Sequence, residues 1–208
     1  MSKPLLRGHF HQAAFFLALG ACAMLLSNAH ATLTQVATII YSLSLISLFG
    51  ISALYHRPTW KPRARMMMRR MDHAAIYILI AGTATPIGLI ALAPEHGMRL
   101  LQLIWGAAFF GIIQSLFWVT APKWLSAILY ITVGCLVVPY FPELKEVFSS
   151  KDLFNLSLGG LIYIFGAIVY ALKRPNPYPK IFGYHEIFHL LVIIGAFFHF
   201  LVINKLIK

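Results

Sequence analysis

Charged residues are scarce in this chain, and their scarcity excludes most soluble folds. Only 11% of its 208 residues are Asp, Glu, Lys or Arg, and 60% are hydrophobic. A typical soluble domain carries about 25% charged and about 45–50% apolar residues. The mean hydropathy of +0.78 reflects the same imbalance. A core of this size cannot bury so much apolar surface, so the sequence predicts an integral membrane protein.

Cysteine and acidic residues are also few. Cys22 and Cys135 are the two cysteines, and both lie inside apolar runs, which excludes a disulfide framework and a cysteine zinc site. Six Asp and Glu residues stand against 17 Lys and Arg, which gives a formal charge of +11. Cations of a membrane protein orient its helices and face anionic headgroups. We therefore expect membrane lipids, and no nucleic acid, as partners.

Seven segments are long and apolar enough to cross a bilayer as helices, which takes roughly 20 residues each. Proline and glycine residues mark the breaks between them, and the sequence has neither strand alternation nor a fixed-period repeat. We therefore predict an all-α, polytopic membrane fold in which residues 1–208 form a single domain. The expected spans are Gln12–Asn28, Leu33–Tyr55, His73–Ala93, Met98–Val119, Trp124–Phe141, Leu153–Leu172 and Tyr184–Asn204.

The loop cations predict the orientation of these helices. Twelve of the 17 Lys and Arg residues fall on one side of the expected membrane and five on the other, so the N-terminus is expected inside and the C-terminus outside. The densest cluster, residues 61–70, is expected to form a basic loop or an amphipathic helix on the inner leaflet. Residues 27–31 also resemble a signal-peptidase site, and cleavage there would leave six spans. The small, tail-free chain suits a bacterial inner membrane.

Ionisable residues at membrane depth are costly and indicate function. His56 ends the second expected span four residues after Ser52, which places both on one helix face. His185 and His189 have the same spacing near the start of the seventh span, as in helical histidine pairs that bind zinc. Asp72 opens the third span. The topology therefore brings three imidazoles and one carboxylate to a similar depth on the cytoplasmic side.

This group of residues predicts a Zn²⁺ site. Three imidazoles with an open fourth position are typical of catalytic zinc. Asp72 would then be a fourth ligand, or would accept a proton from the bound water, and Ser52 would support the site. Simpler interpretations remain open: Asp72 as a helix N-cap, His56 as an interfacial residue, and Ser52 as a hydroxyl bonded to its own helix.

Other polar residues of the spans have simpler expected roles. His199 lies ten residues beyond His189, roughly 15 Å along a helix, so we expect a buried hydrogen bond there and no shared ion. Glu186 is expected at the rim of the site or in a supporting position. His11 lies near a span end, where solvation explains it. Residues 82–86 combine small residues, which allow close helix contact, with a proline that would kink the helix.

The motifs together resemble a known family. Ser52-Ala-Leu-Tyr-His56, Asp72 and His185-Glu-Ile-Phe-His189 occur in this order along the chain. They resemble the haemolysin III branch of the progestin and adipoQ receptor family, which is grouped with the alkaline ceramidases among seven-helix membrane hydrolases. The resemblance implies zinc held by His56, His185 and His189. It further implies that Asp72 engages the zinc-bound water.

The N-terminal segment departs from that family pattern. Many bacterial relatives have Glu and Asn before a His-Gly in this region, whereas this chain reads Arg7-Gly-His-Phe-His-Gln12. The departure leaves the metal-binding motifs untouched. The short N-terminus, with no extracellular domain, makes hormone binding unexpected.

The site residues therefore predict a zinc-dependent hydrolase of a membrane-lipid amide or ester, and the resemblance implies a ceramidase-like activity and a role in membrane-lipid homeostasis. One alternative is a non-catalytic lipid sensor or regulator in which a structural zinc joins the second and seventh spans. Another is a haemolysin III-type pore-forming cytolysin. A pore needs a polar stripe along several helices, and the spans contain few polar residues.

Overall fold

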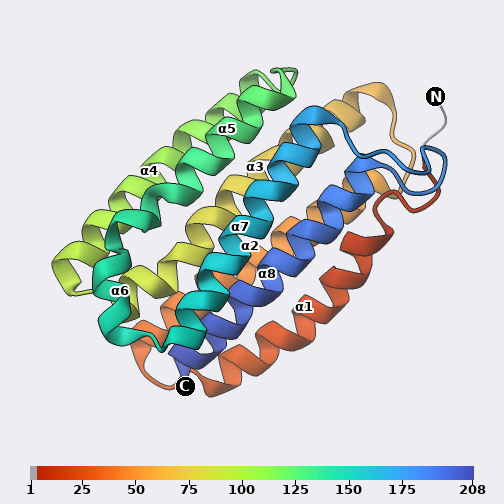
Figure 1. Cartoon of the computed structure of the whole chain (residues 1–208). Helices are drawn as coiled ribbons and strands as arrows, with labels where there is room; N and C mark the ends of the chain where they lie inside the picture. The colour runs from red at the N-terminus through yellow and green to blue at the C-terminus, as the bar shows by residue number, and fades with distance from the viewer. Residues whose placement is uncertain (1–3) are drawn as a thin grey trace.

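Seven helical spans run side by side in an elongated bundle (Figure 1). The computed structural model describes residues 4–208, so Lys3, one of the twelve cations counted above, lies outside the described part. All seven helical spans are long and apolar enough to cross a membrane, which confirms the predicted all-α, seven-span fold. In order they are α1 (His9–Asn28), α2 (Thr32–His56), α3 (Pro62–Pro86) continued by η1 (Ile87–Ala91), α4 (Pro94–Phe117), α5 (Lys123–Gly134) continued by η2 (Cys135–Tyr140) and α6 (Phe141–Val147), α7 (Ser150–Leu172) and α8 (Tyr184–Ile207).

The first and last spans are neighbours although they lie at opposite ends of the chain. Helix α1 packs against both α2 and α8 (Figure 1). Helix α2 also packs on α3, α3 on α4, α5 on α7, and α7 on α8. The helices that carry the predicted site residues are therefore connected: α3 contacts both α2 and α8, and α1 packs against α2 and α8.

Helix α3 begins well before the apolar run that predicted it. It starts at Pro62 with Lys61 at the N-cap position, because proline suits a first turn and the Arg and Met residues that follow are good helix formers. The basic cluster is therefore helical and continuous with the span, and the loop alternative is wrong. Asp72 lies ten residues after Pro62, inside the helix, so its interpretation as an N-cap is wrong too.

Residues 82–86 behave as the small-residue and proline pattern predicts. A Cβ on Gly82 would lie 2.3 Å from the Ser44 Oγ of α2, so glycine is what allows α2 and α3 to approach this closely. Directly after Pro86 the α-helix gives way to the π-helix η1. Proline disrupts the regular helix because it has no N–H to donate and its ring crowds the preceding turn.

The fifth span is longer than the sequence predicts. The expected end was Phe141, but the helical path continues through η2 and α6 to Val147. Pro139 lies inside the 3-10 segment η2, and Pro142 lies in the first turn of α6. A proline in a first turn removes no intrahelical hydrogen bond, so Pro142 begins a helix here and does not end the span.

Candidate metal centre

Three histidines from two helices converge at one end of the bundle, which we call the histidine end. His56 is the last residue of α2, and His185 and His189 lie one turn apart at the start of α8. The Nε2 atoms of His185 and His56 are 3.1 Å apart. One ring nitrogen of each of the three lies within 4.8 Å of the others. The structure thus brings together the three residues that the sequence singled out as ligands.

The spacing of these nitrogens fits a single metal ion. Zinc binds histidine nitrogen at about 2.0–2.1 Å in tetrahedral geometry, which separates two bound nitrogens by roughly 3.3–3.4 Å. The 3.1 Å between the His56 and His185 nitrogens is close to that value, and the His189 nitrogen lies within 4.8 Å of both. Imidazole suits several transition metals, zinc among them. The cluster is therefore chemically suited to hold a metal ion with a free coordination position.

Asp72 of α3 lies beside this cluster. Its Oδ2 is 3.8 Å from His56 Nε2, which is too long for a direct hydrogen bond. The Ser52 side chain lies next to the Asp72 carboxylate. Ser52 and Asp72 are only 2% and 9% exposed. Ser52 and Asp72 thus form a buried polar pair beside the three histidines.

His11 is a fourth histidine at this end, and its interpretation as a solvated residue is wrong. It is 2% exposed, and its ring stacks on that of His189 with 3.8 Å between centroids. On α1 it continues a buried stripe formed by Ala14, Ala18 and Cys22. Their spacing of three and four residues marks a helix face that packs inward. That periodicity is a sequence signal that the His11 side chain is buried.

The segment before α1 is fixed to the start of α8. Arg7 forms an ion pair with Glu186, whose side chain is completely buried. Glu186 also accepts a hydrogen bond of 2.8 Å from the Gly183 N–H in the capping box of α8. Backbone N–H groups of residues 5–6 donate to carbonyls of residues 180–181. Glu186 is therefore buried beside His185. Of the two places expected for it, the rim of the site and a supporting position, it occupies the supporting position.

The start of α1 also contacts the end of α2. Gly8 has a φ of +82°, and a Cβ there would come within 2.8 Å of the His56 Cβ, so glycine is required. Arg57 donates a 2.8 Å hydrogen bond to Gln12 Oε1 and lies 2.6 Å from His9 Nε2. The N-terminal stretch that departs from the family pattern thus packs directly on a predicted metal ligand.

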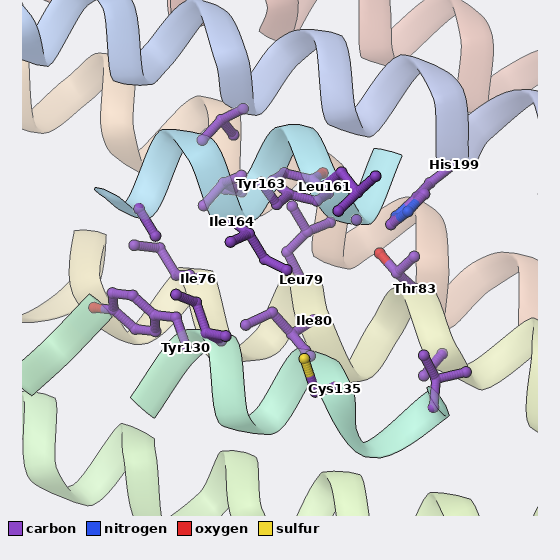
Figure 2. Close-up of a pocket in the computed structure, with 18 of the residues that line it drawn as sticks. Ile76, Leu79, Ile80, Thr83, Tyr130, Cys135, Leu161, Tyr163, Ile164 and His199 are labelled. Carbon is purple, nitrogen blue, oxygen red and sulfur yellow. The ribbon is translucent and has the colours of Figure 1, made fainter. Parts of the chain in front are cut away.

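A cavity of about 390 Å³ extends from the histidine end into the bundle. His189, Asp72 and Ser52 line its polar end, and most of the remaining lining is apolar side chains of α3, α5, α7 and α8 (Figure 2). Leu161 of α7 and Val138 of η2 also line it and are 62% and 54% exposed. The cavity therefore reaches the outer surface of the bundle between α7 and the α5–η2 segment.

Comparison with known proteins assigns the chain to a family. The family model described as Haemolysin-III related matches residues 1–200. The chain belongs to the haemolysin-III related family. Hemolysin-3 of Bacillus cereus is 33% identical over 189 residues, which cover 89% of this chain and 83% of that protein. The Hemolysin-3 homolog of Bacillus subtilis (strain 168) is 34% identical over 157 residues, 76% of this chain and 70% of the homolog.

The match extends to the wider receptor family. The Adiponectin receptor protein of Drosophila melanogaster is 28% identical over 156 residues, which are 67% of this chain and 35% of that receptor. These matches confirm the predicted membership in the haemolysin III branch of the progestin and adipoQ receptor family. Together with the seven spans, they identify an integral membrane protein.

Proposed function

We propose that this protein is a zinc-dependent hydrolase that cleaves an amide or ester bond of a membrane lipid. The observation that carries the proposal is the cavity. It leads from Asp72 and His189, one of the three clustered histidines, to the outer surface of the bundle, and its walls are mostly apolar. Such a shape suits a ligand with one polar end and a hydrocarbon chain.

Each polar residue of the histidine end has a role in this reaction. His56, His185 and His189 would hold the ion through neutral ring nitrogens. When bound, zinc would polarise the lipid carbonyl and make water a stronger nucleophile at neutral pH. Asp72 accepts the proton of the attacking water and passes it to the leaving amine or alcohol. Ser52, which lies next to the carboxylate, would hold it in place through a hydrogen bond.

The cavity also accounts for how an insoluble substrate reaches the site. A lipid enters between α7 and the α5–η2 segment, where Leu161 and Val138 are exposed. Its acyl chain stays among apolar side chains while the carbonyl moves to the histidine end. Water reaches the reacting carbonyl only at the polar end, since the remaining lining is mostly apolar.

A second candidate is a lipid sensor in which zinc is a structural clamp. The observation that favours it is that the three histidines come from only two helices, α2 and α8, so one ion would join their ends. A third candidate is a haemolytic protein, supported by the name of the Bacillus cereus relative. The few polar residues lining the described cavity do not favour a water-filled pore.

Turnover of defined lipids by the purified chain separates these functions. Zinc-loaded protein in nanodiscs is given fluorescent ceramides, other N-acyl lipids and ester phospholipids, and release of labelled fatty acid is measured. We expect hydrolysis that stops with a chelator and returns with zinc, and that is unchanged in His30→Ala, since His30 is exposed in the α1–α2 turn.

Other results of the same experiment would support one of the two alternative functions. Zinc that stabilises the fold without turnover of any lipid supports the clamp, and dye leakage from vesicles supports the haemolytic function. Turnover that survives complete removal of metal contradicts the hydrolase proposal.

A further inference from the structure

The cavity has a second polar end, remote from the three histidines. Along α3 and into η1 its lining runs from Asp72 to Ile87, and on α8 it includes His189 and, further along, His199. Ten residues of helix separate the two histidines by about 15 Å. Figure 2 shows the Thr83 hydroxyl and the His199 ring turned toward each other at this remote end. None of the roles proposed above uses this pair.

One nitrogen of His199 is already committed to the backbone. Its Nε2 lies 3.1 Å from the carbonyl oxygen of Leu156 in α7. A carbonyl can only accept, so Nε2 carries the proton and Nδ1 of the neutral ring is an acceptor. Nδ1 is buried and has no hydrogen-bond partner among the described residues. A buried acceptor of this kind normally has a partner, because leaving it unpaired is costly.

The ring of His199 is held in position by its neighbours. A Cβ on Gly159 would lie 2.4 Å from His199 Cδ2 and 2.6 Å from Nε2, so the ring occupies space that only glycine leaves free. The Tyr163 ring packs beside it with 5.3 Å between centroids. The Cδ2–Nε2 edge therefore faces α7, and Nδ1 lies on the opposite side of the ring. His199, which lines the cavity, is thus held with Nε2 against α7 and with Nδ1 as its buried, unpartnered acceptor.

We propose that His199 and Thr83 bind a hydroxyl group on the chain of the lipid, so that the preferred substrate carries a mid-chain hydroxyl. The ligand O–H donates to His199 Nδ1, and the Thr83 hydroxyl donates to the ligand oxygen. A keto group cannot satisfy Nδ1, because it has no proton to donate. The inference rests on the proposed function, because it requires an acyl chain in the cavity.

The distance between the two polar ends fixes the position of the hydroxyl. An extended chain advances by roughly 1.2–1.3 Å per carbon–carbon bond of about 1.5 Å, so about 15 Å corresponds to about twelve carbons. A fatty acid with its carboxylate at the histidine end would place a C12 hydroxyl near His199. The probe is therefore 12-hydroxystearate, and its matched controls are stearate and 12-oxostearate.

Direct competition between these fatty acids tests the proposal. Zinc-loaded full-length protein in nanodiscs is equilibrated with equal mole fractions of two probes, and the bound ratio is read by native mass spectrometry. A hydrogen bond of ordinary strength predicts a preference for 12-hydroxystearate of roughly 5- to 10-fold over both controls. We expect His199→Phe to abolish the preference and keep stearate binding. Thr83→Val, which keeps the side-chain shape, should reduce it without affecting folding.

The possible failures are distinguishable. If wild-type protein binds stearate and 12-hydroxystearate equally, the hydroxyl subsite is wrong while the acyl-binding cavity stands. A preference that persists unchanged in both His199→Phe and Thr83→Val also overturns the subsite. If no fatty acid is retained at all, the proposed function fails and the inference fails with it.

Discussion

The rings of His11 and His189 lie face to face, 3.8 Å apart between centroids and 11° from parallel. This contact joins the first span directly to a candidate metal ligand on the last. It means that α1 is part of the site and not a peripheral anchor. A residue 178 positions earlier in the sequence therefore packs directly against the His189 ring of the three-histidine cluster.

Removing the His11 ring should therefore weaken metal binding. We expect His11→Ala to lower zinc affinity by roughly 10-fold, the lower end of the range for residues that orient metal ligands. His11→Phe should retain much of the affinity because it keeps a flat ring against His189. Zinc affinity is measured by chelator competition, with His30→Ala as the control. Wild-type affinity in His11→Ala would show that the stack does not support the ligand.

The metal content of purified protein should follow the three-histidine cluster. We expect about one zinc per chain, lost in His185→Ala and His189→Ala and kept in His30→Ala, because three converging nitrogens fit one ion. Zinc should also raise the thermal unfolding temperature, since it binds the folded state preferentially. Elemental analysis and thermal unfolding in detergent measure these effects. Full zinc occupancy in His189→Ala is incompatible with the assigned ligand set.

Asp72→Asn should separate proton transfer from metal binding. Asparagine keeps the shape and the Ser52 contact but cannot act as a base, and Asp72 lies 3.8 Å from His56 Nε2. We expect zinc to remain bound while turnover falls by roughly 10²–10⁴-fold. Loss of zinc would make Asp72 a direct ligand. Full turnover with full zinc would remove it from the mechanism.

Gly82 should tolerate no side chain. The Cβ of Gly82→Ala would lie 2.3 Å from Ser44 Oγ and 2.5 Å from Ser44 Cβ, so α2 and α3 would have to separate, at a cost of about 1–3 kcal/mol. Gly106→Ala is the matched control, because nothing lies within 4 Å of its added Cβ. Thermal unfolding of both variants tests this, and the double variant Gly82→Ala/Ser44→Gly should recover stability. Equal stability of the two single variants would contradict the close packing.

The loop charges predict an N-terminus in the cytoplasm and a C-terminus outside. Reporter fusions at both ends, active on only one side of the membrane, check this directly. We expect opposite signals from the two fusions because seven helices separate them. Termini on the same side would point to six spans, as cleavage after Ala31 would produce.

Apolar runs predicted the number and approximate places of the spans, because hydrocarbon solvent imposes a length on every crossing helix. They failed where a helix leaves the hydrocarbon: α3 extends back to Pro62 through its basic residues, and the α5–η2–α6 span continues past Pro142. Hydropathy indicates which residues of a helix are surrounded by lipid, whereas backbone hydrogen bonding determines the residue at which the helix ends. The interpretation of Asp72 as a helix N-cap is wrong for this reason.

The candidate ligands could be predicted because spacing within one helix fixes a face, as for His185 and His189. His11 could not be placed by spacing alone. Its neighbour is on another helix, and only the packing of α1 against α8 brings the two rings together. The same holds for His199, whose niche depends on Gly159 of α7.

The opening beside Leu161 and Val138 also determines how any ligand of the cavity should be measured. A molecule that enters there arrives by two-dimensional diffusion within the leaflet and never dissolves in the aqueous phase. Its occupancy then depends on its share of the surrounding lipid, so that adding inert lipid at constant total ligand lowers saturation, while adding buffer leaves saturation unchanged.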